Sequence, residues 1–362
     1  MRAVLTLLLA IGLLAACSPA APSPPATPTA GAGAAASPTA AAAAPPTPPV
    51  PLKVGLLFSA SDGGILIGVE RGYYREEGLD IELVQFDTGP SMFAPLATGQ
   101  IDIGGPSPDA TFLNAYSRNI PIKIVADKGV NSPGHGFNAI LVRKDLWDSG
   151  EVRDYADLRG RTIATLAPQN AQEIQLELAL ARANLRLEDV RLVHMPFPDM
   201  LPALANRSVD LAMNIEPFPT LAVERGIAVR WKGIDEIYPN HQIAAMFYAP
   251  HFYQAQPEAA RRFMVGYLRA VRDYVDAFER NRGRAEVIEI MTRTTTVKDP
   301  AIWEKMVTPG LNPDGYVNVE SLAYDQEWYL ARGVVRERVD INQVVDMQYV
   351  EYALSRLGRY AR

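Results

Sequence analysis

The sequence predicts an α/β fold of two lobes, and three observations lead to this prediction. Short apolar strand patterns alternate with amphipathic helical patterns, which is typical of a sheet covered by helices. The alternation occurs in two blocks, residues 52–130 and 160–232. One strand pattern, 137–142, joins the blocks, and a second, 243–248, leads back out. We therefore expect two lobes with mixed sheets flanked by helices, joined by two hinge strands around a cleft.

The first block shows the alternation most clearly, between Lys53 and Gly105. Two apolar runs, Lys53–Phe58 and Ile81–Phe86, are each followed by a polar, Gly-bearing turn and then by a helical pattern. In such folds ligands bind at the carboxyl ends of the strands and at helix N-termini. We expect this stretch to form one wall of the cleft.

The helices and remaining strands of the two blocks follow from periodicity and from residues typical of helix ends. Gly78 and Gly99 are placed to end helices, and Pro90 to begin one. The predicted helices are 63–77, 90–99, 108–118, 170–183, 198–206 and 217–225. The further predicted strands are 101–103, 120–126, 162–165, 190–195, 209–213 and 228–231. The blocks share an architecture, but they show no clear sequence repeat.

The domain organisation follows from these elements. We expect the first lobe to comprise residues 52–136 and, after the second hinge strand, residues 249–362. The second lobe is expected at 143–242. From Pro257 onward the pattern is mostly helical, and these helices are expected to pack on the first lobe.

The first 17 residues have the pattern of a targeting segment. Arg2 precedes an apolar run, Val4 to Leu14, that is too short to span a bilayer. The run ends in Leu14-Ala15-Ala16-Cys17, which resembles the lipobox of bacterial lipoproteins. That resemblance implies lipidation at Cys17 and an extracytoplasmic, membrane-anchored protein. The alternative is ordinary secretory cleavage beside an incidental cysteine.

Residues 18–51 consist almost entirely of Ala, Pro, Ser, Thr and Gly, with no charged or aromatic residue. Such a composition cannot bury enough apolar surface to fold. We expect a disordered tether between the membrane and the folded lobes.

Composition and motifs exclude several classes of function. The chain has 362 residues and a net charge of -6 without a basic run, so nucleic acid is not expected as a partner. The single cysteine rules out an intramolecular disulfide and a multi-cysteine metal site. The four histidines are scattered, and common catalytic and nucleotide-binding motifs are missing. We therefore expect no enzyme, no metal and no cofactor.

Five segments carry a resemblance to a known family. They are 72–82 (GYYREEGLDIE), 96–104 (LATGQIDIG), 157–164 (DLRGRTIA), 203–212 (ALANRSVDLA) and 216–217 (EP). Their order and spacing resemble the solute-binding proteins of ABC transporters in the nitrate/sulfonate/taurine group, which includes relatives of the thiamine-pyrimidine synthases. The resemblance spans about residues 52–300. It implies a type II periplasmic-binding clamshell that captures a small molecule and delivers it to a permease with its ATPase.

Two departures limit what the resemblance implies about the ligand. The synthases of the group use a cysteine-rich motif, and this chain has no cysteine beyond Cys17. Binders of thiamin precursors and riboflavin in the group often carry Pro-Asn after the first strand, where this chain has 58–62 (FSASD). A small organic molecule or oxyanion is the expected ligand. A heteroaromatic vitamin precursor is the alternative ligand, and a sensory binding module is the alternative role.

Loops at strand ends supply the candidate ligand-binding residues. In the first lobe they are Ser61, Asp62, Gly89, Ser91, Pro106 and Ser107. In the second lobe they are Gln169, Asn170, Asn214 and Glu216. Ser, Asp, Asn and Glu at these places can equally cap helices without touching a ligand. Asp62 would repel an anion, so either it faces away as a cap or the ligand carries a donor or a positive group. We expect the lobes to close over the ligand and the protein to be a monomer.

Overall fold

The computed structural model describes residues 48–361 of the chain. The chain divides into two units, Met1–Ala44 and Pro45–Arg362, and everything described below belongs to the second. The expected signal peptide, the lipidation site Cys17 and nearly all of the expected tether lie outside the described residues. Among the described helices, none is both long and apolar enough to cross a bilayer.

The first lobe is built on a mixed sheet of five strands in the order β2-β1-β3-β10-β4. β1 runs parallel to β2 and β3, whereas β10 is antiparallel to β3 and β4. The strands are β1 (Val50–Leu56), β2 (Leu79–Gln85), β3 (Ile103–Gly104), β4 (Lys123–Asn131) and β10 (His241–Tyr248). Because β1 begins at Val50, the last two residues of the expected tether belong to this sheet.

The second lobe has a sheet of the same design, in the order β7-β6-β8-β5-β9. Here β6 runs parallel to β7 and β8, and β5 is antiparallel to β8 and β9. The strands are β5 (Asn138–Arg143), β6 (Thr162–Thr165), β7 (Arg191–His194), β8 (Leu211–Ile215) and β9 (Ala228–Gly233). The two-lobed α/β fold is confirmed, and the matching strand orders confirm the shared architecture of the two blocks.

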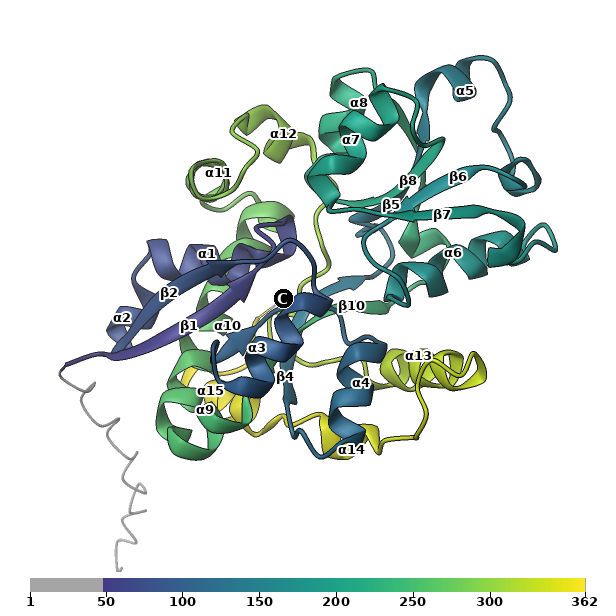
Figure 1. The fold of residues 1–362 in the computed structure, drawn as a ribbon. Helices are drawn as coiled ribbons and strands as arrows, with labels where there is room; N and C mark the ends of the chain where they lie inside the picture. Colours follow the sequence, from purple (N-terminus) through teal and green to yellow (C-terminus); the bar gives the residue numbers. More distant parts are fainter. Residues whose placement is uncertain (1–47, 362) are drawn as a thin grey trace, which may run out of the picture. The chain divides into compact units, whose positions relative to one another are not determined.

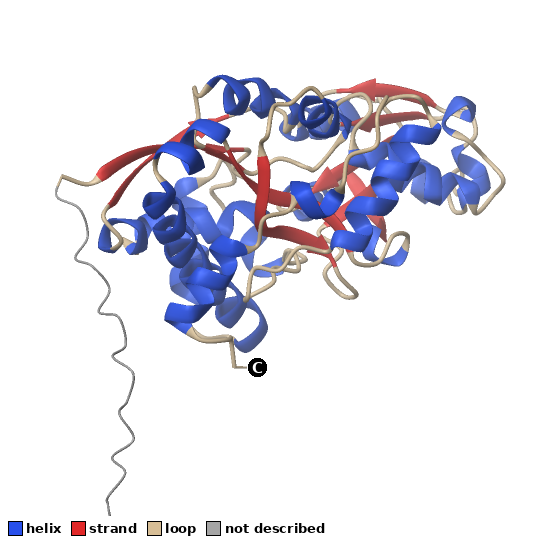
Figure 2. Ribbon diagram, turned by 90° about the horizontal axis from the view of Figure 1, so that it is seen from below, coloured by secondary structure: helices blue, strands red, loops and turns tan. Residues whose placement is uncertain are grey.

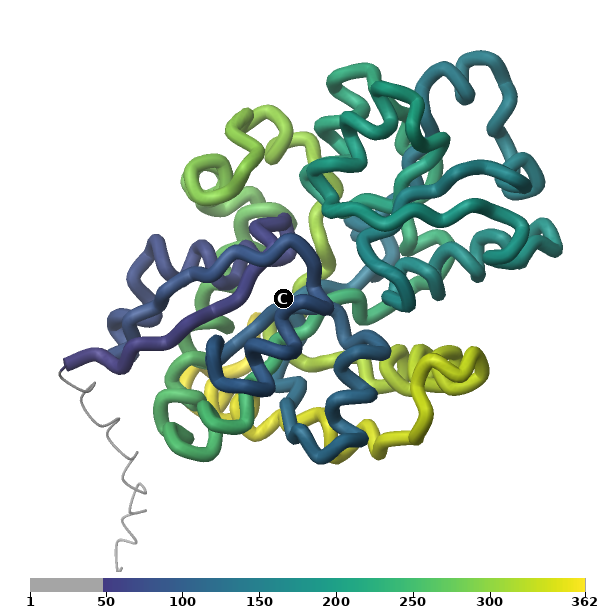
Figure 3. The backbone as a smooth tube through the Cα atoms, viewed as in Figure 1, coloured from purple at the N-terminus to yellow at the C-terminus, as the bar shows by residue number. Residues whose placement is uncertain are grey.

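The two segments that we expected as hinge strands are placed differently. Residues 137–142 fall mainly in β5, inside the second sheet, and residues 243–248 fall in β10, inside the first. Each segment belongs to one lobe because its backbone hydrogen bonds are made within one sheet. The chain crosses between the sheets through residues 132–137 and 234–240, and this path can be followed in Figure 3.

Fifteen α-helices are present in the part of the chain that the structure describes. Those before β10 are α1 (Gly63–Glu70), α2 (Tyr73–Glu76), α3 (Phe93–Thr98), α4 (Ala110–Ser117), α5 (Lys144–Asp148), α6 (Ala171–Ala181), α7 (Phe197–Ala205) and α8 (Phe218–Glu224). Those after it are α9 (Pro250–Ala255), α10 (Pro257–Arg280), α11 (Arg284–Thr294), α12 (Pro300–Lys305), α13 (Val319–Ala331), α14 (Ile341–Val344) and α15 (Gln348–Leu357). The expected helix 63–77 is two helices, because Gly72 has a φ of +75°.

Glycines bring α1 unusually close to the long helix α10. A Cβ atom on Gly63 would lie 2.5 Å from Cδ2 of Tyr274, and one on Gly64 would lie 2.6 Å from Cγ2 of Val271. These contacts belong to the core of the first lobe, in which Tyr274 and Val271 are 1% exposed. The two glycines at the start of α1 therefore allow close packing of the two helices.

The C-terminal helices complete the first lobe but also reach the second. In Figures 1 and 2 the helices that follow β10 surround the first sheet, and α15 packs on α10 and β4. In addition, α12 contacts α8 and α13 contacts α6. The indole Nε1 of Trp328 on α13 donates to Glu177 Oε2 on α6 over 2.8 Å. The helices that we expected on the first lobe therefore also contact the second lobe, through α12 and α13.

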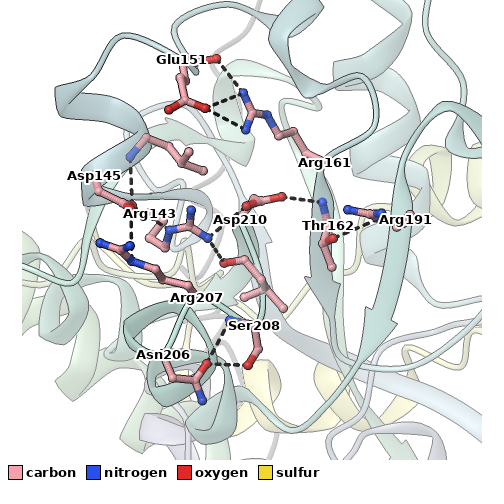
Figure 4. Close-up of polar contacts among 12 residues, drawn as sticks. Arg143, Asp145, Glu151, Arg161, Thr162, Arg191, Asn206, Arg207, Ser208 and Asp210 are labelled. Atoms are coloured by element: carbon pink, nitrogen blue, oxygen red, sulfur yellow. Dashed lines mark hydrogen bonds and ion pairs between the residues drawn. The ribbon is translucent and has the colours of Figure 1, made fainter.

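An aspartate precedes β3 in the first lobe and β8 in the second, and each aspartate holds a neighbouring strand, β1 or β6. Asp210 Oδ2 accepts from the backbone N–H of Thr162 at 2.9 Å, and its Oδ1 accepts from Arg143 Nη1 at 3.0 Å (Figure 4). In the first lobe, Asp102 Oδ2 accepts from the N–H of Lys53 at 2.7 Å. Both aspartates lie in segments that carry the family resemblance. These segments therefore stabilise the ends of the sheets away from the strand carboxyl ends.

Candidate functional site

A cavity of about 50 Å³ lies between the two lobes. Its lining residues are Leu57, Ser59, Ser61, Gly89, Pro90, Gly105, Ser107, Asp109, Lys128, Phe137, Asn138, Leu166, Asn170, Ala171, Gln172, Phe197, Ile215, Ile243 and Ala244. They come from the ends of β1, β3, β6 and β8, from the loops that follow, and from the strands next to the crossing segments. A space of this size holds roughly three or four waters, or one small chemical group.

The lobes contact each other directly beside this cavity. The backbone N–H of Ala60, in the turn after β1, donates to the carbonyl of Glu216, after β8, over 3.1 Å. Both residues lie at strand ends that we expected to face each other across a cleft. The lobes therefore meet beside a small cavity that both of them line.

A buried ion pair forms one wall. Lys128 Nζ lies 2.7 Å from Asp62 Oδ1, and the side chains are 1% and 0% exposed. The same ammonium group donates to Ser61 Oγ at 3.0 Å. Asp62 Oδ2 also accepts from the N–H of Ser59 at 2.8 Å. Asp62 is thus a cap and the partner of Lys128, and it is Lys128 that lines the cavity.

Asp109 contributes a second buried carboxyl group, at the N-terminus of α4. Its Oδ1 accepts from the N–H groups of Thr111 at 2.9 Å and Phe112 at 3.3 Å. Its Oδ2 is buried and has no hydrogen-bond partner among the described residues. Burial raises the pKa of Asp109 to about 7, although the two N–H groups act in the opposite direction.

Two further side chains in the lining leave buried polar atoms unpartnered. Asn138 is 0% exposed, and neither its Nδ2 nor its Oδ1 has a partner within residues 48–361. The same holds for Ser107 Oγ. A buried polar atom without a partner costs roughly 1–3 kcal/mol. The clustering of such atoms with Asp109 around one cavity marks it as the candidate ligand site.

Four of the predicted ligand-binding residues line this cavity, and they come from both lobes. They are Ser61, Gly89, Ser107 and Asn170. Asn170 also caps α6, since its Oδ1 accepts from the N–H of Gln172 at 2.8 Å. Of the others in the first lobe, Pro106 is buried behind the lining, and Ser91 is exposed, with its hydroxyl bonded to the carbonyl of Thr88.

Asn214 and Glu216 turn away from the cavity, and Ile215 between them faces it. Asn214 Nδ2 donates to the carbonyl of Phe197 at 3.0 Å. Glu216 pairs with Arg230 at 3.1 Å and accepts from the N–H of Thr220 at 3.2 Å. Alternate side chains of a strand point to opposite faces, so residues two apart share one face. We expected both residues to face the ligand, whereas in the structure they lie on the side of the strand opposite to the cavity.

Gln169 is also absent from the lining, but its backbone is unusual. It is exposed and has a φ of +58°, and Phe58 has a φ of +56°. Phe58 lies between β1 and α1, and Gln169 lies between β6 and α6, each beside residues that line the cavity. Left-handed conformations in residues other than glycine are uncommon and concentrate at functional sites. This matched pair supports the assignment of the cavity.

The sequence reasoning missed five polar residues of the lining, which are Ser59, Asp109, Lys128, Asn138 and Gln172. Lys128 lies in the second half of β4, which runs parallel to β1, so its end of the strand faces the cleft. An Asp-Lys pair after an apolar strand run was the available signal. The position of Asn138 depends on the crossing segment, which no local pattern reveals.

The arrangement suits binding of a small molecule. Apolar side chains supply much of the lining, among them Phe137, Leu166, Phe197 and Ile243. No histidine or cysteine is among the described lining residues. No group of three or more potential metal ligands occurs among the residues that the structure describes. A polar group can be held at one side while an apolar body fills the rest.

Known binding proteins resemble this chain in sequence and in structure. A binding protein of Brucella abortus (strain 2308) is 27% identical over 229 residues, which are 62% of this chain and 67% of that protein. Among solved structures, the periplasmic nitrate-binding protein NrtA from Synechocystis PCC 6803 superposes with a TM-score of 0.72 at 15% identity, covering 86% of this chain and 89% of that chain.

Two more solved structures bear on the function of the fold. The alkanesulfonate-binding protein SsuA from Xanthomonas axonopodis pv. citri, bound to MOPS, has a TM-score of 0.67 at 19% identity and covers 83% of this chain and 99% of that chain. The desulfurization enzyme DSZB has a TM-score of 0.61 at 16% identity and covers 85% of this chain and 99% of that chain. The fold is the two-lobed type II periplasmic binding fold. One of the proteins with this fold, DSZB, is an enzyme.

The family itself follows from the sequence. The model of the family described as NMT1/THI5 like matches residues 60–277. That range is more than half of the chain and includes all of the residues that line the cavity except Leu57 and Ser59. The chain therefore belongs to the NMT1/THI5-like family.

Proposed function

We propose that this chain is the solute-binding component of an ABC import system, and that it captures a small molecule between its lobes. The observation that carries the proposal is the interlobe cavity, whose lining includes buried atoms of Ser107, Asp109 and Asn138 that have no partner among residues 48–361. The structural relatives NrtA and SsuA, a nitrate-binding and an alkanesulfonate-binding protein, support the same role. The partners of the proposed role are a membrane permease and its ATPase.

The contact between the lobes supports a mechanism in which the lobes open to admit the ligand and close to hold it. A ligand shifts an equilibrium between open and closed lobes only if it binds the closed form better. Contacts such as Ala60 to Glu216 form only when the lobes meet. The crossing segments 132–137 and 234–240 are the places where the backbone would bend.

A thermal-shift panel tests the proposal. The panel contains nitrate, sulfonates, taurine, aromatic carboxylates, pyrimidines and flavins, because the walls formed by Phe137 and Phe197 also favour a heteroaromatic ligand. A ligand present at 100 times its Kd adds about 2.7 kcal/mol to stability. A shift by one class, lost when Asn138 is changed to Leu, is the expected result. Turnover of the bound compound, followed by mass spectrometry, would instead favour an enzyme like DSZB.

The proposed location is extracytoplasmic, with a lipid at Cys17. This part of the proposal is independent of the cavity, because residues 1–47 lie outside the described chain. Cell fractionation of the natural chain and of the Cys17→Ser variant tests it. The natural chain is expected in the membrane fraction and the variant in the soluble extracytoplasmic fraction. Equal distribution of the two would contradict the lipid anchor.

A further inference from the structure

We propose that Asp109 determines ligand choice, and that the cavity takes a small molecule with an apolar body and an N–H donor in preference to a fully ionised oxyanion. The inference rests on the proposed function, since it takes the interlobe cavity as the ligand site. Three features of the lining carry it: its charge balance, the occupation of its helix N-termini, and the geometry of its unpartnered atoms.

The charges in the lining leave no free cation. Lys128 is the only basic side chain among the described residues that line the cavity. Its ammonium group lies 2.7 Å from Asp62 Oδ1, so one positive and one negative charge offset each other. Asp109 adds a carboxyl group beyond this pair. An oxyanion in the cavity would meet a neutralised lysine and an additional carboxyl group, which is unfavourable in a buried site.

Two of the helix N-termini at the cavity, those of α4 and α6, already carry side-chain caps, whereas the turn at Pro90 and the start of α7 carry none. Asp109 Oδ1 accepts from two backbone N–H groups at the start of α4. Asn170 Oδ1 accepts from the N–H of Gln172 at the start of α6. An anion held by a helix N-terminus needs free N–H groups there. At α4, moreover, the capping group is itself a carboxyl, so this end of the cavity is acidic.

The unpartnered atoms describe the ligand group that fits. Asp109 Oδ2 is a buried acceptor without a donor. Asn138 offers one free acceptor and one free donor group in the same lining. A ligand N–H would satisfy Asp109 Oδ2, and a neighbouring carbonyl or ring nitrogen would satisfy Asn138 Nδ2. Hydrogen bonds to an ionised carboxylate are roughly twice as strong as those between neutral groups.

Matched pairs of compounds test the inference, because an amide and a carboxylate of one shape differ in the N–H donor and the charge. Binding of acetamide, acetate, propionamide, propionate and ethanesulfonate to the full chain is measured by calorimetry at pH 8, because compounds of about four to six heavy atoms match the small cavity. Each amide is expected to bind about tenfold or more tighter than its carboxylate. The Asp109→Asn variant keeps a capping oxygen but has no charge, and in it this preference is expected to vanish or reverse.

The control is Asp340→Asn, which makes the same change at the cap of α14. Asp340 accepts from the N–H of Asn342 at 3.0 Å, outside the cavity. This variant is expected to keep the amide preference of the natural chain. Carboxylates or ethanesulfonate binding as tightly as the amides, or an unchanged preference in Asp109→Asn, would overturn the inference and leave the proposed function standing. Failure of every probe and of the whole thermal-shift panel would count against both.

Discussion

Lys128 Nζ and Asp62 Oδ1 lie 2.7 Å apart, with both side chains almost completely buried, at the wall of the interlobe cavity. Removing one member of a buried ion pair leaves the other charge without compensation, which costs roughly 3–5 kcal/mol. We expect Lys128→Met to lower the free energy of unfolding by about this amount in urea titrations. Because Lys144 and Asp148 form an exposed pair at 2.7 Å, Lys144→Met is the control and should cost less than about 1 kcal/mol. Equal losses in the two variants would contradict the buried pair.

Gly105 leaves room for the arm of Lys128. A Cβ atom at this position would lie 2.3 Å from Cε of Lys128, whose far end is held by Asp62. We expect Gly105→Ala to destabilise the protein by about 1–3 kcal/mol, as overpacking does, and to weaken ligand binding by moving Lys128. Gly89→Ala is the matched control, since its Cβ would come no closer than 3.4 Å to Pro106. Thermal unfolding of both variants measures the difference, and a harmless Gly105→Ala would refute the tight contact.

The buried carboxyl of Asp109 makes stability depend on pH. Burial raises its pKa from 3.8 to about 7, so between these values the folded state binds the proton more strongly than the unfolded state does. The free energy of unfolding therefore falls as pH rises from about 4 to 7 and stays lowered above that. Asp109→Asn removes this dependence. When the pH rises from 4 to 8, we expect the free energy of unfolding of the variant to increase relative to that of the natural chain by on the order of 2–4 kcal/mol.

Urea titrations of both proteins at the two pH values measure this gain as a difference. Asp127, whose pKa burial raises to about 6, contributes a dependence of the same sign to both proteins and cancels in the comparison. A constant difference between natural chain and variant across the range would contradict the assignment to Asp109.

Glu216 is buried outside the cavity lining, and its backbone carbonyl accepts the hydrogen bond that joins the lobes at Ala60. It is 0% exposed, pairs with Arg230 at 3.1 Å and accepts from the N–H of Val307 at 3.4 Å. Glu216→Ala would leave Arg230 without its carboxylate partner, and we expect a loss of about 2–4 kcal/mol in stability. Glu224→Ala, which breaks an exposed pair with Lys305, is the control. Lower ligand affinity with unchanged stability would show that Glu216 contacts the ligand after all.

Periodicity and turn residues predicted most of the fold. The alternating strands and helices of the two blocks, and Gly99 as a helix end with a φ of +76°, appear as expected. The hinge strands were wrong because a strand pattern does not reveal which sheet will bind it. Residues 138–143 and 241–248 form internal strands of the two sheets, and the chain passes from one sheet to the other in the less regular segments that precede them.

The site was predicted in part, for a related reason. Loops after strands could be placed at the cleft, and Ser61, Ser107 and Asn170 reached the cavity. The sequence did not allow us to predict which side chains point toward the cavity and which point away from it. In β8 the face that carries Asn214 is opposite to that of Ile215, and the sequence does not show which face the other lobe will cover. Asp109 and Asn138 became site residues only through tertiary packing.

The hydrogen bond from Trp328 to Glu177 joins a helix of the C-terminal region to a helix of the second lobe. An indole emits differently when its N–H is bonded to a carboxylate in a packed interface than when water surrounds it. Any separation of α13 from α6 would therefore change the intrinsic fluorescence of the chain. The protein carries a built-in optical reporter of its own opening, and ligand capture could be followed in real time without attaching a dye.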